Sequence, residues 1–91
     1  MPEMTQKLED YNLVIKHGNE AIEVSAPTIP EALAKVKLAK IMGKISVTVT
    51  HGNLHTEQLL KAWYFKKLLI SNDYKLLFEK RAKQFLGELK G

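Results

Sequence analysis

The sequence contains no cysteine, and its wholly apolar runs are only a few residues long. Without cysteine the chain can form neither a disulfide framework nor a thiolate metal site, so a hydrophobic core must supply the stability and a reducing compartment fits best. Runs this short cannot span a bilayer, and residues 1–10 carry three acids without an apolar stretch. We therefore expect no signal peptide and no membrane span, and we interpret the protein as cytoplasmic.

Motifs for catalysis or cofactor binding are also missing. The sequence has no glycine-rich phosphate loop and no nucleophile elbow. His51 and His55 have a spacing that could chelate a metal if both lay on one helix, but Gly52 and Asn53 break a helical register between them. We interpret His51 as a turn residue and expect a protein that is not an enzyme, with no metal and no cofactor. A small catalytic or ligand-binding subunit is a third hypothesis, which lacks a supporting constellation of residues.

Length and charge describe one small basic domain. The 91 residues, 45% hydrophobic and 26% charged, have the composition of an ordinary globular protein. So short a chain buries just over ~60% of its extended surface on folding, which makes self-association an option. Residues 1–26 hold two bases and five acids, whereas residues 27–91 hold twelve bases and five acids. The downstream excess of +7 fits either a polyanionic partner or lysine-rich helix faces in solvent.

The first half of the chain predicts a hairpin followed by a helix. Two β-rich runs surround a Gly-Asn turn from Tyr11 to about Ser25. Thr28 and Glu31 have the spacing of a capping box, which predicts a helix over residues 29–42 that ends at Gly43 in a left-handed cap. We interpret residues 1–10 as a flexible N-terminal segment and residues 11–91 as a single α/β domain.

The second half predicts one strand and a C-terminal helical hairpin. Residues 45–50 alternate between apolar and polar side chains, as a strand does, and the preceding helix could be the crossover of a right-handed β-α-β unit. Thr56 is a candidate N-cap for a helix through about Ile70, and Ser71 to Asp73 offer caps for a helix from Tyr74 to about Leu86. The predicted order is ββαβαα, with a small mixed sheet packed by helices.

The segment around Trp63 is apolar almost all round, so it needs cover on more than one side. If the sheet and the last helix cover it, its aromatic residues are core. Otherwise part of it is an exposed apolar patch, which usually marks a protein contact. On this basis we predict a protein-interaction or regulatory module that acts through an aromatic helical hairpin. We expect it to bind a protein partner and to form a homodimer. The predicted partner-binding residues are Trp63, Tyr64, Lys67 and Leu68.

The alternative is a nucleic-acid-binding protein. On the predicted first helix, three lysines recur at positions that share one stripe, and further bases follow downstream. Against this alternative, the sequence lacks an RNA-recognition aromatic motif, a GXXG loop, zinc-finger spacing and a helix-turn-helix pattern. The candidate phosphate-binding residues are Lys37, Lys40, Lys44, Lys66, Lys80, Arg81 and Lys83.

Overall fold

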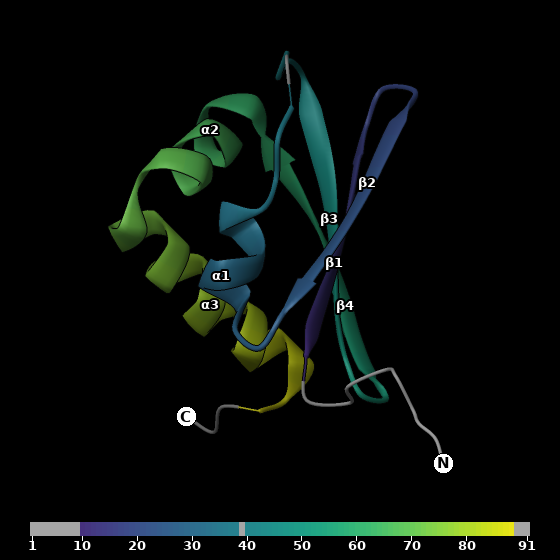
Figure 1. Ribbon diagram of the computed structural model, residues 1–91, viewed down its shortest axis with the longest axis vertical. Coiled ribbons are helices and arrows are strands. Elements are labelled where there is room, and N and C mark those ends of the chain that lie inside the picture. Colours follow the sequence, from purple (N-terminus) through teal and green to yellow (C-terminus); the bar gives the residue numbers. More distant parts are fainter. Residues whose placement is uncertain (1–9, 39, 89–91) are drawn as a thin grey trace.

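A four-stranded sheet and three helices follow one another in the order ββαββαα in the computed structural model, which describes residues 10–38 and 40–88. The strands lie in the spatial order β2-β1-β3-β4, and every neighbouring pair is antiparallel. All three helices lie on the same side of the sheet (Figure 1). The strands are β1 (Tyr11–His17), β2 (Glu20–Ala26), β3 (Lys44–His51) and β4 (Leu54–Lys61), and the helices are α1 (Ile29–Ala34), α2 (Ala62–Ile70) and α3 (Asn72–Leu86).

Two hairpins build the sheet, and each has a two-residue turn. His17 pairs with Glu20 across the first turn, and His51 pairs with Leu54 across the second. In both turns the glycine has a positive φ, 61° at Gly18 and 65° at position 52, where a side chain would be strained. The first hairpin was predicted and is confirmed. The repeated His-Gly-Asn tripeptide is thus the same turn chemistry used twice.

The core lies between the sheet and the helices. Because strand side chains alternate, β1 turns Leu13 and Ile15 towards the helices, and β3 turns Ile45, Val47 and Val49 the same way, all of them buried. The helices complete this core with Phe65, Leu68, Phe78 and Ala82. The opposite face of the sheet has no covering helix (Figure 1). It carries polar and charged side chains such as Asn12, Lys16, Ser46, Thr48 and Glu57.

The predicted helix over residues 29–42 is correct at its start and wrong at its end. Thr28 is the N-cap, because its Oγ1 accepts a hydrogen bond from the backbone N–H of Glu31 at 3.3 Å. However, α1 stops at Ala34, and Gly43 lies immediately before β3 and caps no helix. Nε2 of His17 lies 3.0 Å from the backbone nitrogen of Met42 and 2.9 Å from its oxygen. This contact joins the last residue of β1 to the segment that leads into β3, a tertiary position that local helix propensity does not determine.

The predicted second helix begins later than expected, because residues 54–61 form β4. Thr56 pairs with Val49 in the sheet, and α2 begins only at Ala62. The sheet is wholly antiparallel, which corrects the predicted mixed sheet. The strands β2 and β3, which α1 connects, run in the same direction, but β1 lies between them and pairs with both. The α/β class and the C-terminal helical hairpin are confirmed, with Ser71 joining α2 to α3. Apart from Asp10, the predicted flexible segment at residues 1–10 lies outside the described residues.

The neighbouring aromatic residues Phe65 and Trp63 differ in burial, so their removal should have different effects. Phe65 is fully buried, and Phe65→Ala should lower the free energy of unfolding by about 3–5 kcal/mol, a large part of the total for a small domain. Trp63 is mostly exposed, and Trp63→Ala should cost under about 1 kcal/mol. Urea unfolding followed by circular dichroism measures both values. Equal losses would contradict the burial of Phe65 in the core.

Candidate functional site

The outer side of α2 combines aromatic, aliphatic and basic side chains. A helix turns about 100° per residue, so Phe65 and Leu68 point to the sheet while residues 63, 66, 67 and 70 point to solvent. Trp63 is 58% exposed and Ile70 is 79% exposed. Large apolar side chains this exposed on the same side of one helix are unusual on a monomer surface that binds nothing.

The outer side of α3 also combines aromatic, aliphatic and basic side chains. Its inward side carries Phe78, Ala82 and Leu86, which are buried. Its solvent side carries Leu77, 52% exposed, and Phe85, 60% exposed. We call the solvent-facing side chains of the two helices the hairpin surface. It consists of Trp63, Lys66, Lys67, Ile70, Asn72, Asp73, Leu76, Leu77, Lys80, Arg81, Gln84 and Phe85.

Three aromatic rings connect the hairpin surface to the inside of the domain. The Trp63 ring meets the Tyr64 ring edge to face, with ring centres 5.7 Å apart, and Tyr64 meets Tyr74 of α3 in the same way at 5.7 Å. Both tyrosines are half-buried and pack against the core. Edge-to-face pairs add to the stabilisation from burial. Trp63 is therefore held on one side while most of its ring stays open to solvent.

The hairpin also carries the net charge of the whole chain. Helices α2 and α3 together hold six bases and two acids, a balance of +4, whereas the rest of the sequence holds eight of each. Lys75 is buried, and Lys83 lies 3.5 Å from Glu79 in an ion pair. The remaining cations of the two helices, all exposed, are Lys66, Lys67, Lys80 and Arg81.

Of the four predicted partner-binding residues, the structure places two fully at the surface. Trp63 and Lys67 are exposed on the outer side of α2. Tyr64 is half-buried between the rings of Trp63 and Tyr74. Leu68 is 0% exposed and packs in the core, so it cannot touch a partner directly and is removed from the predicted set.

The predicted basic stripe on the first helix does not form. Because α1 ends at Ala34, Lys37 and Lys40 lie in the irregular segment after it, and Lys44 begins β3. Their helical spacing therefore has no structural meaning. The other predicted phosphate-binding residues lie on α2 and α3. Lys83 forms an ion pair with Glu79, and its Nζ lies 5.8 Å from the centre of the Tyr11 ring. The exposed ones are Lys66, Lys80 and Arg81.

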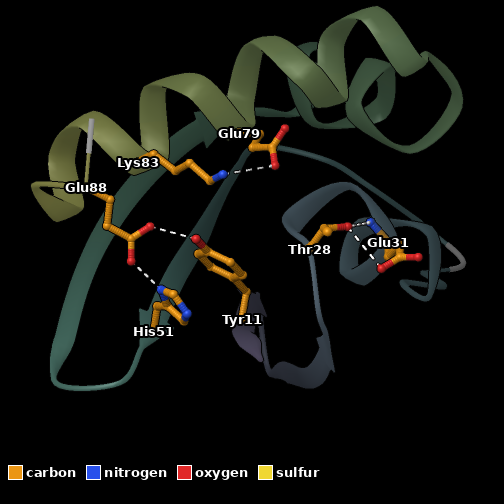
Figure 2. Close-up of polar contacts among 7 residues, drawn as sticks. All are labelled: Tyr11, Thr28, Glu31, His51, Glu79, Lys83 and Glu88. Carbon is orange, nitrogen blue, oxygen red and sulfur yellow. Dashed lines mark hydrogen bonds and ion pairs between the residues drawn. The ribbon is translucent and has the colours of Figure 1, made fainter. Parts of the chain in front are cut away.

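A polar network that the sequence did not reveal joins the start of β1, the end of β3 and Glu88, the second residue after α3 (Figure 2). The Tyr11 hydroxyl donates to Oε1 of Glu88 at 2.6 Å, and Nδ1 of His51 contacts Oε2 of the same carboxylate. The rings of Tyr11 and His51 stack with centres 3.9 Å apart. We call these three residues the terminal clasp. Tyr11 and Glu88 are 77 positions apart, so no local pattern could have brought them together.

The clasp changes the acidity of two of its members. Burial, reinforced by the hydrogen bond to Glu88, raises the pKa of Tyr11 well above its usual value. Burial alone would raise the pKa of Glu88, but hydrogen bonds from Tyr11 and His51 outweigh it, and the pKa of this carboxyl lies below its usual value. At neutral pH the clasp therefore holds a neutral tyrosine against a charged carboxylate.

His51 and His55 lie on opposite sides of the sheet. His51 lies at the end of β3 on the side of the sheet that faces the helices, whereas His55 pairs with Thr50 and lies on the open side. Within residues 10–38 and 40–88, no group of three or more metal-binding side chains is found. Among the helices of the same residues, none is long and apolar enough to cross a membrane.

Comparison with known proteins gives no relative for this chain. No family model matches the sequence, and neither the curated proteins nor the solved structures contain a match.

Glu88→Gln should weaken the fold at neutral pH and reduce its sensitivity to acid. A carboxylate whose pKa is lowered on folding stabilises the native state above its usual pKa, and that contribution is lost as the pH falls through the lowered value. We expect a loss of about 1–2 kcal/mol at neutral pH, since hydrogen bonds to a charged group are lost. The difference between wild type and variant should shrink as the pH falls below 4.5, the usual value for this group.

Urea unfolding at several pH values measures this difference. Glu23→Gln is the matched control, because Glu23 is an exposed acid on the edge strand β2. Its effect should be small at every pH. A Glu88→Gln effect that stays constant from neutral pH to acid would contradict the role of the charged clasp.

Proposed function

We propose that this chain is a non-enzymatic protein-interaction module that binds its partner through the hairpin surface. One observation carries the proposal. Within the part of the chain that the structure describes, five of the eight exposed large hydrophobic residues belong to α2 and α3: Trp63, Ile70, Leu76, Leu77 and Phe85. Apolar side chains gathered in one region, with basic residues among them, have the composition of a protein interface core and rim.

The aromatic contacts support Trp63 as the anchor of this interface. Tryptophan is enriched at binding hot spots because it buries a large apolar area with little loss of side-chain freedom. Here its neighbour Tyr64 already holds the ring at 5.7 Å between centres, so binding would order fewer side chains. A partner that covers Trp63 would gain most of its apolar contact there.

Nucleic-acid binding is the second candidate, favoured by the +4 balance of the hairpin. Phosphates would engage the four exposed cations, but they would leave Ile70 and Leu77 without an apolar partner. The open side of the sheet does not offer the stacking platform of RNA-binding sheets, because the described strand residues there include no phenylalanine, tyrosine or tryptophan. Binding to protein accounts for the aliphatic residues as well as for Trp63.

Self-association is the simplest form of the proposal. A homodimer through the hairpin surface would cover Trp63, but it would also bring two +4 hairpins together, which costs free energy. Molecular mass by sedimentation equilibrium decides this point. A mass of two chains at tens of micromolar that returns to one chain in Trp63→Ser would support the homodimer, and a monomer would assign the surface to another protein.

Photo-crosslinking tests the proposal directly. A benzoylphenylalanine at position 63 should crosslink to the partner in a cell extract, and the added substitution Leu77→Ser should reduce the yield by about tenfold if it removes one contact of average weight. The matched control carries the crosslinker at position 59, because Leu59 is 64% exposed but lies on the open side of the sheet. Equal products from both positions, or nucleic acid as the crosslinked species, would overturn the proposal.

A further inference from the structure

We infer that the partner of the hairpin surface is an acidic amphipathic segment of another protein, one that presents apolar side chains and carboxylates together. This inference rests on the proposed function and specifies its partner. It comes from the way in which charged and apolar side chains alternate along both helices.

On α2 the basic residues lie between the two exposed apolar ones. Trp63 and Ile70 are seven positions apart, so they lie on one line along the helix, two turns from each other. Lys66 and Lys67 fall between them, one on each side of that line. A partner that lies along α2 therefore meets an apolar site, then a pair of cations, then a second apolar site.

The same arrangement recurs on α3. Leu77 is followed three and four positions later by Lys80 and Arg81, as Trp63 is by its two lysines. Phe85 then follows one turn after Arg81 and is exposed. Two helices thus present the same order of apolar and basic groups, although their sequences are otherwise different.

The four cations of this pattern are not neutralised within the domain. Within the part of the chain that the structure describes, no carboxylate pairs with Lys66, Lys67, Lys80 or Arg81. The one exposed acid of the hairpin surface is Asp73, at the first turn of α3. Carboxylates on a partner would therefore meet unpaired charge, and their attraction would set both the orientation and the rate of docking.

Other occupants fit the pattern less well. A helix that lies on a membrane separates its apolar side from its basic side, whereas here the more apolar sides already face the sheet and the outer sides mix both types. The phosphates of a nucleic acid would contact the cations but would leave Ile70 and Leu77 without an apolar partner. A second copy would oppose like charges across the interface. An acidic amphipathic segment satisfies both the apolar and the basic residues.

Synthetic helical peptides test the inference. Three peptides of about 18 residues, or five turns, carry the same leucine stripe and differ only in having glutamate, glutamine or lysine at the other positions. Trp63 is the only tryptophan of the chain, so its fluorescence reports binding at the site itself. We expect the glutamate peptide to bind at least about tenfold more tightly than the glutamine peptide, and this advantage to shrink between about 50 mM and about 200 mM salt.

A charge swap makes the test specific to the site. In the double variant Lys66→Glu with Lys67→Glu, the preference should invert, so that the lysine peptide binds best. The control is Lys16→Glu with Lys44→Glu, which changes the net charge equally at exposed positions on the open side of the sheet. That control should keep the wild-type preference, because charges away from the site act weakly through salt solution.

Each remaining outcome overturns the inference. Equal affinity for the glutamate and glutamine peptides, reduced alike by Leu77→Ser, would mean that the partner is apolar without an acidic requirement, and the proposed function would stand. No shift of Trp63 fluorescence with any peptide up to about 1 mM would reject the acidic segment. A shift with phosphatidylserine vesicles or mixed-sequence DNA but not with peptides would assign the surface to a membrane or to nucleic acid. A doubled mass would assign it to a second copy of the chain. In each case the crosslinking result tests the proposed function separately.

Discussion

Packing of all three helices against one face of a four-stranded sheet is the interaction on which the rest of this structure depends. The alternation of side chains along the strands places apolar residues on that face, and the helices pack Phe65 and Phe78 against it. A two-layer domain of this kind has only one internal boundary. Each helix can therefore bury only one of its sides, and whatever its other side carries is presented to the surroundings.

This constraint explains why the residues around Trp63 divide as they do. Successive positions on α2 point in different directions, so Phe65 enters the core while Trp63, two positions earlier, stays outside. A third layer would be needed to cover Trp63, and residues 10–38 and 40–88 form only two. The exposed apolar residues are thus a consequence of how few layers the domain has. Basic residues lie among them, so the outer surface of the helices presents both apolar and positively charged groups.

Much of the fold could be predicted because local chemistry and tertiary structure agree there. The Gly-Asn turn, the Thr28 cap and the alternation of β3 each specify their own conformation. The strand β4 could not be predicted, since its helix-facing positions include Thr56 and Gln58, and these polar residues hide the apolar alternation. The Nε2 atom of Gln58 is even buried without a hydrogen-bond partner in the described part of the domain.

The site was predictable to the extent that it depends on side-chain type. Trp63 and Lys67 could be selected from composition, but Leu68 could not be excluded until the sheet fixed which side of α2 faces inward. The path of the chain after α1 includes a contact between His17 and Met42, 25 positions apart, and the clasp joins Tyr11 to Glu88, 77 positions apart. Contacts over such distances are properties of the folded arrangement, which single-sequence patterns do not contain.

The terminal clasp also bears on how the domain opens. The ends of a chain usually fray first, independently of each other. Here Tyr11 of β1 and His51 of β3 both contact the carboxylate of Glu88, the second residue after α3, so the end of α3 and the start of β1 cannot separate without breaking these bonds. Amide protons of β1 and of the last turn of α3 should consequently exchange with solvent at similar rates, as members of one cooperative unit that includes the centre of the domain.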